Sequence, residues 1–432
     1  MSADNDKVVI LGANGVMGAA VAAVFAGGGY NVIMLARDRD KAAQALEAAK
    51  AVARAEAVAL RVTLGTYDGD MRRAVGEASL VFEALAEDLV LKREFFKRVD
   101  AWRRPEAVVA TNSSGLSITE MGRGMSDSFR RNFLGIHMYN PPHIIVGTEL
   151  IPHPETDAEV LRRVAATLAR RFGRKVIVAA DRPAFVGNRV GFRVMNEVAQ
   201  LAEEHGVAFI DYLVGPHTGR AMAPLSTVDL VGWDVHKAIV DNVHAHCQDA
   251  ARDCFKLPAY MERGIADGRL GDKTADKGGF YRRAAGRTVE VLDPQKGAYQ
   301  PYIPPRQIEF VERMKTLNRV GRYGDAMTVL ATTPGMQADL ARKVVLGYVS
   351  YALNLVGEVA HSPADVDTIM SYGFNWAPPC VIVDLIGPRN ALELMNRNGL
   401  AVPPAVEQAA AKGTKLFAGG VLEYGRTFVG FG

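Results

Sequence analysis

Residues 8–18 read VVILGANGVMG, an apolar run rich in β-branched residues that leads into glycines spaced Gly-x-x-Gly-x-x-Gly. An Ala-rich stretch of helical character follows, and residues 32–35 form a second apolar run. Glycines at a turn from strand to helix let backbone N–H groups approach a pyrophosphate at the helix N-terminus. The stretch therefore predicts a dinucleotide-binding turn, whose expected contacts are Gly12, Asn14, Gly15, Val16, Met17 and Gly18.

The same stretch has no charged residue between Val8 and Ala36, which is long enough to cross a bilayer. Its many glycines, and its change from strand-like to helix-like character and back, argue against a membrane span. Strands that are buried on both faces of a parallel sheet show such uninterrupted apolar runs. We therefore interpret it as a buried strand-helix-strand unit and predict no membrane association.

Apolar runs of strand length alternate with helical stretches as far as about residue 180. Such alternation is typical of a doubly wound α/β domain with a mostly parallel sheet. We predict that residues 1–182 form this Rossmann-like domain. Its expected strands are 8–11, 32–35, 80–82, 108–111, 134–138, 149–151 and 176–179, and its expected helices include 38–54 and 89–102.

The rest of the chain is predicted to be mostly helical. A first helical domain is expected at residues 183–285, with helices at 185–205 and 225–245. A linker with a Pro-rich end is expected at 286–307, and a second helical domain at 308–432.

The two helical regions share a pattern of residues that recurs about 155 positions further along the chain. Several matches in the same order at a nearly constant offset indicate a duplication rather than chance. We therefore predict two duplicated all-α domains. The matched pairs are Glu203 with Glu358, Asp211 with Asp367, Pro224 with Pro378, Asp229 with Asp384, and Gly232 with Gly387.

The composition, 49% hydrophobic and 23% charged over 432 residues, is that of an ordinary soluble globular protein. The 51 basic and 48 acidic residues leave a net charge of +3, which favours neither nucleic acid nor a polybasic membrane surface as a partner. Three cysteines without a Cys-x-x-Cys pair favour free thiols in a reducing compartment, and the acidic first seven residues are unlike a signal peptide. We expect a cytoplasmic protein without a metal site.

The end of the second strand distinguishes NAD from NADP in such domains, because an acidic residue there binds the ribose 2′-hydroxyl of NAD. Ala36 occupies this position, followed by Arg37 and Asp38. Arg37 would suit the 2′-phosphate of NADP, or it is an ordinary solvated surface residue. Asp38 would serve NAD if the turn is displaced. We expect NAD, and NADP stays an open alternative.

Two polar residues stand near the predicted ligand-binding edge of the sheet. His137 ends an apolar strand before a Pro-bounded turn, and Glu149 lies in the extended segment after that turn. If the segments pair as a hairpin, Glu149 would orient the His137 imidazole and stabilise its protonated form. Oxidation of a hydroxyl by hydride transfer needs such a base, and histidine suits it near neutral pH. Taken singly, however, His137 would be interpreted as a core histidine and Glu149 as a surface carboxylate.

Four separated motifs change that interpretation: residues 111–119 (TNSSGLSIT), 137–142 (HMYNPP), 181–189 (DRPAFVGNR) and 223–234 (APLSTVDLVGWD). Together they resemble the L-3-hydroxyacyl-CoA dehydrogenases of fatty-acid β-oxidation. The resemblance is close over residues 7 to about 245 and looser beyond them. Gly115 and Ala184 depart from the family's serine and glycine, but neither change removes a catalytic group.

The resemblance implies that the chain oxidises a 3-hydroxyacyl-CoA to the 3-oxoacyl-CoA with NAD(P). It implies that His137 is the general acid/base and that Glu149 pairs with it. It also implies that Ser114 contacts the reacting oxygen, and that Asn188 contacts either this oxygen or the thioester side of the substrate. The cofactor contacts that it implies are Glu83, Lys92 and Asn112; for Glu83 and Lys92 the alternatives are a strand-end acid and a solvated lysine.

The resemblance also bears on assembly, because single-copy members of the family dimerise through the small helical domain. A second copy in the same chain would mimic that dimer internally, so we expect a monomer or a homodimer. Association with other β-oxidation enzymes, and a longer multifunctional protein of which this chain is a part, remain open. The competing functions are a dehydrogenase for a small hydroxy acid without CoA, and a catalytically inactive dinucleotide-binding protein.

Overall fold

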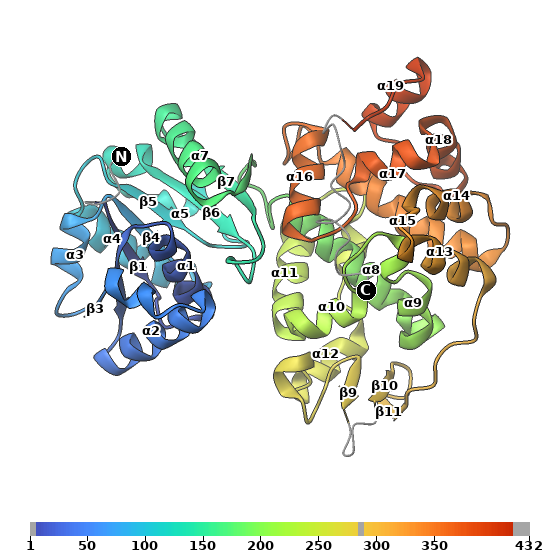
Figure 1. Ribbon diagram of the computed structural model, residues 1–432, viewed down its shortest axis with the longest axis horizontal. Helices are drawn as coiled ribbons and strands as arrows, with labels where there is room; N and C mark the ends of the chain where they lie inside the picture. Colours follow the sequence, from blue (N-terminus) through green and yellow to red (C-terminus); the bar gives the residue numbers. More distant parts are fainter. Residues whose placement is uncertain (1–5, 284–288, 418–432) are drawn as a thin grey trace. The chain divides into compact units, whose positions relative to one another are not determined.

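The computed structural model describes residues 6–283 and 289–417, and the chain divides into two compact units, 1–185 and 186–432 (Figure 1). The predictions that concern residues 1–5, part of the acidic N-terminus, and residues 418–432, the end of the second helical domain, lie outside the described residues.

The first unit is built on an eight-stranded sheet in the order β3-β2-β1-β4-β5-β6-β7-β8. Every neighbouring pair is parallel except β6 and β7, which are antiparallel. This order confirms the predicted doubly wound α/β domain. The strands are β1 (Lys7–Leu11), β2 (Asn31–Ala36), β3 (Val62–Thr66), β4 (Leu80–Glu83), β5 (Val108–Thr111), β6 (Phe133–Met138), β7 (Gly147–Pro152) and β8 (Lys175–Val178).

Helices flank this sheet, and several begin at an aspartate whose side chain accepts a backbone N–H of the first turn, as at Asp38, Asp88 and Asp157. The helices are α1 (Val16–Gly27), α2 (Arg39–Ala53), the 3₁₀ helix η2 (Glu56–Arg61), α3 (Met71–Glu77), α4 (Leu89–Trp102), α5 (Ile118–Gly122), α6 (Asp127–Arg131) and α7 (Ala158–Phe172).

The central position of β1 explains the uncharged stretch at residues 8–36. Val9 and Ile10 point to opposite faces of the sheet, yet both are fully buried. A strand that is covered on both faces has no place for a charge. Among the described residues, no helix is long and apolar enough to span a membrane.

The strand register aligns the carboxyl ends of the central strands. Leu11 at the end of β1 lies opposite Glu83 of β4, and Glu83 lies opposite Thr111 of β5. The chain runs from β1 to one side of the sheet and returns to the other side at β4. Such a switch point opens a crevice at the carboxyl ends, where doubly wound folds bind their ligands.

The second unit is mostly helical, as predicted. Its helices are α8 (Gly187–His205), α9 (Val207–Leu213), η3 (Pro216–Thr218), α10 (Pro224–Val231), α11 (Trp233–His246), η4 (Arg252–Phe255), α12 (Ala259–Ala266), η5 (Gly271–Thr274), α13 (Glu309–Arg319), α14 (Tyr323–Thr332), α15 (Met336–Asn354), α16 (Pro363–Gly373), α17 (Pro379–Ile386), α18 (Pro388–Arg397) and α19 (Pro404–Lys412).

One expectation about secondary structure was wrong, and two features were not predicted. The single helix expected at 225–245 is two helices, because Gly232 between them has a φ of +100°. The segment expected as a linker contains β10 (Val289–Asp293) and β11 (Ala298–Pro301), which form an antiparallel sheet with β9 (Tyr281–Arg283) and were not predicted. Strand β3 was not predicted, because it is only partly buried and contains a glycine.

Buried aspartates tie loops to helices in the second unit. Asp229 on α10 accepts hydrogen bonds from Trp233 Nε1 and from the backbone N–H groups of Phe280 and Tyr281, all at 2.8 Å. Asp229 is only 3% exposed, so water could not easily replace its carboxylate as the acceptor for these donors. Strand β9, which begins at Tyr281, is therefore anchored to α10 through the Asp229 carboxylate.

Replacement of Asp229 by alanine would leave three donors without an acceptor, two of them buried and the Tyr281 N–H partly buried. We expect Asp229→Ala to lower the free energy of unfolding by about 3 kcal/mol, at roughly 1 kcal/mol or more for each orphaned donor. Equilibrium urea unfolding followed by circular dichroism measures this change. The control is Asp241→Ala, which removes only an exposed ion pair with Lys237 on α11 and should cost about 0.5 kcal/mol or less. Equal effects of the two substitutions would contradict the anchoring role of Asp229.

Candidate active site

His137 and Glu149 lie directly opposite each other on the antiparallel strands β6 and β7. His137 Nδ1 is 2.6 Å from Glu149 Oε2, and the two residues are 2% and 0% exposed. The predicted hairpin pairing is therefore confirmed. A carboxylate at Nδ1 places the imidazole proton on that nitrogen, so that Nε2 is the atom available as a base. Within the described residues Nε2 has no hydrogen-bond partner.

Tyr139 is a third member of this group that the sequence did not identify. Its hydroxyl donates a hydrogen bond of 2.7 Å to the same oxygen of Glu149, and its ring lies 4.7 Å from the His137 ring. Burial raises the pKa of Tyr139 well above its usual value, and the Glu149 charge raises it further, so the phenol stays protonated. Tyr139 directly follows β6, and its spacing of two residues from His137, which puts side chains of extended backbone on one face, is the signal that could have found it.

The glycine turn fits a dinucleotide. Gly12 has a φ of +83°, and a Cβ there would lie 2.3 Å from the carbonyl oxygen of Ala84. A Cβ on Gly18 would lie 2.1 Å from the carbonyl oxygen of Gly12. Glycine is thus required for the turn to pack against β4 and α1. Helix α1 begins after Gly15 without a side-chain cap, so its N-terminus offers uncapped backbone donors to a pyrophosphate.

Tyr67, just after β3, supports this turn from outside and was also missed. Its hydroxyl oxygen accepts a hydrogen bond of 2.9 Å from the Gly12 N–H. Its ring packs edge-on against Phe95, with ring centroids 4.9 Å apart. Because β3 itself was not predicted, nothing in the sequence connected Tyr67 to the glycine turn.

At the end of β2, Arg37 and Asp38 are both exposed. The Asp38 side chain accepts the Lys41 N–H at 2.8 Å and so caps α2. This contact favours Asp38 as a structural residue. Within the described part of the chain, Arg37 forms no hydrogen bond or ion pair, and its guanidinium is available to solvent or a ligand.

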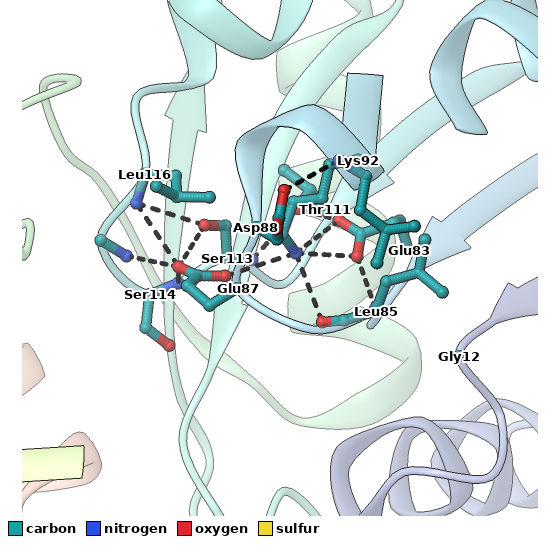
Figure 2. Close-up of polar contacts among 12 residues, drawn as sticks. Gly12, Glu83, Leu85, Glu87, Asp88, Lys92, Thr111, Ser113, Ser114 and Leu116 are labelled. Carbon is teal, nitrogen blue, oxygen red and sulfur yellow. Dashed lines mark hydrogen bonds and ion pairs between the residues drawn. The ribbon is translucent and has the colours of Figure 1, made fainter. Parts of the chain in front are cut away.

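Glu83 and Lys92 form a buried ion pair at the end of β4, with Lys92 Nζ 2.8 Å from Glu83 Oε1 (Figure 2). Glu83 also accepts hydrogen bonds from the Thr111 hydroxyl and the Leu85 N–H, both at 2.5 Å. These partners surround the Glu83 carboxylate, which joins β4, β5 and α4 at the carboxyl edge. The predicted cofactor contacts of Glu83 and Lys92 stay predictions.

A second acidic residue of the same loop, Glu87, was missed. Its carboxylate reaches Lys92 at 3.3 Å and accepts hydrogen bonds from the backbone of residues 114–116 (Figure 2). Glu87 therefore connects the lysine that neutralises Glu83 to the loop that carries Ser114. Nothing in the sequence indicated these contacts, because Glu87 stands in a segment that was predicted to be a loop.

The remaining predicted residues fall in both units. Asn112 follows β5, and its side-chain oxygen accepts the Met138 N–H at 2.9 Å, next to His137. The loop with Ser114 follows directly, so the structure brings Ser114, Asn112 and His137 to neighbouring strand ends. Asn188 lies in the first turn of α8 in the second unit and is 6% exposed.

Comparison with known proteins identifies the family on both units. The 3-hydroxyacyl-CoA dehydrogenase NAD binding domain matches residues 7–182, and the 3-hydroxyacyl-CoA dehydrogenase C-terminal domain matches residues 185–283. A probable 3-hydroxyacyl-CoA dehydrogenase of Deinococcus radiodurans is 32% identical over 64% of this chain and 82% of the relative.

A probable 3-hydroxyacyl-CoA dehydrogenase of Bacillus subtilis is 27% identical over 95% of this chain, which spans 55% of that relative's length. Among solved structures, a 3-hydroxybutyryl-CoA dehydrogenase from Escherichia coli aligns with a TM-score of 0.70 over 94% of this chain and 98% of the other. At 21% identity this alignment shows a shared fold. On the evidence of the two matched domains, the chain belongs to the 3-hydroxyacyl-CoA dehydrogenase family.

Proposed function

We propose that the chain oxidises a 3-hydroxyacyl-CoA to the 3-oxoacyl-CoA, with NAD as the hydride acceptor. The observation that carries this proposal is the buried contact of His137 Nδ1 with Glu149, 2.6 Å long, at the carboxyl edge of the dinucleotide-binding sheet. Such a pair provides a base whose tautomer and orientation are both defined by a neighbour.

The protein's own part in the reaction is proton transfer and positioning. His137 Nε2 would take the proton of the substrate's 3-hydroxyl group, and Glu149 would stabilise the imidazolium that forms. Bound NAD supplies the acceptor for the hydride that leaves C3. The roles of Ser114 and Asn188 at the reacting oxygen are proposed from their family motifs.

The names of the relatives favour a CoA thioester over a free hydroxy acid. The Escherichia coli structure and the Bacillus and Deinococcus relatives are named as dehydrogenases of 3-hydroxybutyryl-CoA or 3-hydroxyacyl-CoA. Other relatives are named as fatty acid oxidation complex proteins, and the chain spans about half of their length. Association with further β-oxidation enzymes and a cytoplasmic location belong to this proposal. Among the described residues, Cys247, Cys254 and Cys380 form no disulfide, which is consistent with a reducing compartment.

We also infer that the second helical region duplicates the first. Helices α8 to α12 correspond in order to α15 to α19. Equivalent aspartates make equivalent contacts: Asp211 accepts the Leu225 N–H, and Asp367 accepts the Cys380 N–H. Asp384 accepts the N–H groups of Leu416 and Phe417, as Asp229 does with Phe280 and Tyr281.

The two regions also pack on each other as the halves of a symmetric dimer would. The equivalent helices α8 and α15 are in contact. Arg220 and Trp376 form an antiparallel bridge, and in the aligned repeat Trp376 is the counterpart of Met222. In an isologous interface, the same surface patch of each copy contacts its counterpart on the other copy. The bridge follows this pattern, because Arg220 pairs with the counterpart of a residue only two positions away. The second region would then cover the surface through which single-copy members dimerise.

The second region also contacts the helix that carries Asn188. Arg189, the next residue on α8, donates to the Tyr351 hydroxyl at 3.0 Å and pairs with Glu358 at 2.9 Å. The ring of Phe374 lies against Gly191, where a Cβ would be only 2.1 Å from it. These contacts support a structural role for the second region in holding the first turns of α8.

The first prediction concerns the proposed reaction. The chain should oxidise 3-hydroxybutyryl-CoA and reduce acetoacetyl-CoA, with far lower activity on free 3-hydroxybutyrate. His137→Ala and Glu149→Gln should lower kcat by about 100-fold or more, because a positioned acid/base contributes about 10²–10⁴-fold. Steady-state assays with NADH test both statements. The control is His143→Ala, an exposed histidine of the following loop; a His137→Ala enzyme as active as this control would contradict the assignment.

The second prediction concerns the cofactor. NADH should support the reaction, and Arg37 should let NADPH compete, because nothing in the described residues neutralises its charge. Arg37→Ala should therefore raise the KM for NADPH several-fold and leave that for NADH nearly unchanged. Measurement of KM for both cofactors decides the point. A wild-type chain that strongly prefers NADH, with no response of the NADPH reaction to Arg37→Ala, would exclude a role for this residue.

The third prediction concerns assembly. Since the second helical region covers the first within one chain, light scattering should give the mass of a monomer, 46.7 kDa. A dimer that dissociates on dilution, with a loss of amide protection in its helical unit, would contradict the interpretation that the second helical region takes the place of a partner subunit.

A further inference from the structure

Two donors meet at a single oxygen atom of Glu149. Its Oε2 lies 2.6 Å from His137 Nδ1 and accepts a hydrogen bond of 2.7 Å from the Tyr139 hydroxyl. His137 is 2% exposed, Glu149 is fully buried and Tyr139 is 8% exposed. Water therefore has little access to this oxygen, and the imidazole and the phenol share its negative charge where electrostatic interactions are strong.

The Tyr139 hydroxyl is a donor to this carboxylate at every pH at which the enzyme would work. Burial raises the pKa of the Tyr139 phenol well above its usual value, and the charge and the hydrogen bond of Glu149 raise it further. An ionised carboxylate can only accept hydrogen bonds. The contact is therefore a charge-assisted hydrogen bond, which is roughly twice as strong as one between neutral groups.

The hydroxyl is separate from the packing that holds the imidazole in place. The rings of Tyr139 and Phe185 lie 4.7 Å and 5.5 Å from the His137 ring, at interplanar angles of 60° and 59°. These contacts involve ring atoms, so the substitution Tyr139→Phe would keep them. What it removes is one oxygen atom and its hydrogen bond to Glu149.

The charged groups of the neighbouring strands are placed or paired elsewhere. On β8, Lys175 shares a face with Glu149 but lies two positions out of register with it and is exposed. Arg174, just before β8, donates to two backbone carbonyl groups of the loop between β6 and β7. On the β5 side, Glu83 and Lys92 pair with each other. The Tyr139 hydroxyl, in contrast, touches the carboxylate that touches the base.

We propose that Tyr139 is a positioning residue, whose hydroxyl orients the Glu149 carboxylate and limits the proton affinity of the His137–Glu149 pair. A donor stabilises the pair more when the imidazole is neutral and the pair carries a net negative charge than when imidazolium and carboxylate neutralise each other. The hydroxyl therefore favours the form in which His137 Nε2 is a base. The proposal rests on the proposed function, in which that nitrogen takes the proton of the substrate hydroxyl.

The first test is the pH dependence of kcat/KM for oxidation of 3-hydroxybutyryl-CoA with NAD, in wild type and Tyr139→Phe. Below the pKa of the pair the imidazole is protonated and cannot accept the substrate proton, so the rate falls as the pH falls. Without the hydroxyl the pair binds its proton more tightly. The acidic limb should therefore move to higher pH by about half a unit or more in Tyr139→Phe. On the plateau above it, kcat should fall less than about tenfold, because the base itself remains.

Tyr30→Phe is the matched control, because Tyr30 is a buried tyrosine of the same unit that precedes β2, at the opposite edge of the sheet. It should leave the acidic limb where it is in wild type. The proposal is overturned if the limb of Tyr139→Phe stays in place or moves to lower pH, or if the two Tyr→Phe substitutions shift it equally.

A titration of the His137 imidazole by ¹⁵N NMR gives a readout that does not depend on activity. Its midpoint should rise by the same amount in Tyr139→Phe. In a Glu149→Gln background, Tyr139→Phe should have almost no further effect on the midpoint, because the hydroxyl acts through the carboxylate. An unchanged midpoint, or equal shifts in the two backgrounds, would overturn the proposal.

The two measurements also separate this proposal from the function on which it rests. A wild-type chain that is inactive on 3-hydroxybutyryl-CoA and acetoacetyl-CoA would contradict the proposed function. The NMR midpoints of wild type and Tyr139→Phe would still decide whether the Tyr139 hydroxyl controls the proton affinity of the His137–Glu149 pair.

Discussion

A carboxylate with no exposed surface lies against a histidine between β6 and β7, and this contact constrains the first unit around it. Burial of a lone carboxylate costs several kcal/mol or more unless it is paired and hydrogen-bonded. Contacts with His137 Nδ1 and the Tyr139 hydroxyl, both at the same oxygen of Glu149, offset that cost. The antiparallel β7, inserted in an otherwise parallel sheet, provides the register in which this is possible.

The neighbouring acids at the carboxyl edge follow the same principle. Glu83 is neutralised by Lys92 and bound by Thr111, and Glu87 shares Lys92 and binds the loop with Ser114. Each acid has its own set of donors from an adjacent strand end. The acids thus bind strand ends to one another, and the loop that follows β5 is fixed relative to the strand that carries His137. A site built in this way is organised before its ligands arrive, which is what electrostatic catalysis requires.

The sequence was sufficient where a local pattern determines the structure. The apolar runs and the glycine turn predicted the doubly wound sheet, and the Pro-bounded turn between two extended segments predicted that His137 meets Glu149. It was insufficient where a contact joins distant elements. Tyr67 reaches Gly12 across 55 positions, and Glu87 reaches the loop after β5 across 26 or more. The break at Gly232 was missed because the apolar pattern continues through it, although its positive φ interrupts the helix.

The most direct test of this account is the tautomer of His137, measured by ¹⁵N NMR of labelled imidazoles in the neutral form, with the signal assigned by its loss in His137→Ala. The Glu149 contact predicts that Nδ1 carries the proton and that Nε2 is unprotonated, as a base for the substrate hydroxyl must be. A neutral imidazole protonated at Nε2 would contradict the central claim, because it would have no lone pair to offer at Nε2, the nitrogen that has no hydrogen-bond partner among the described residues.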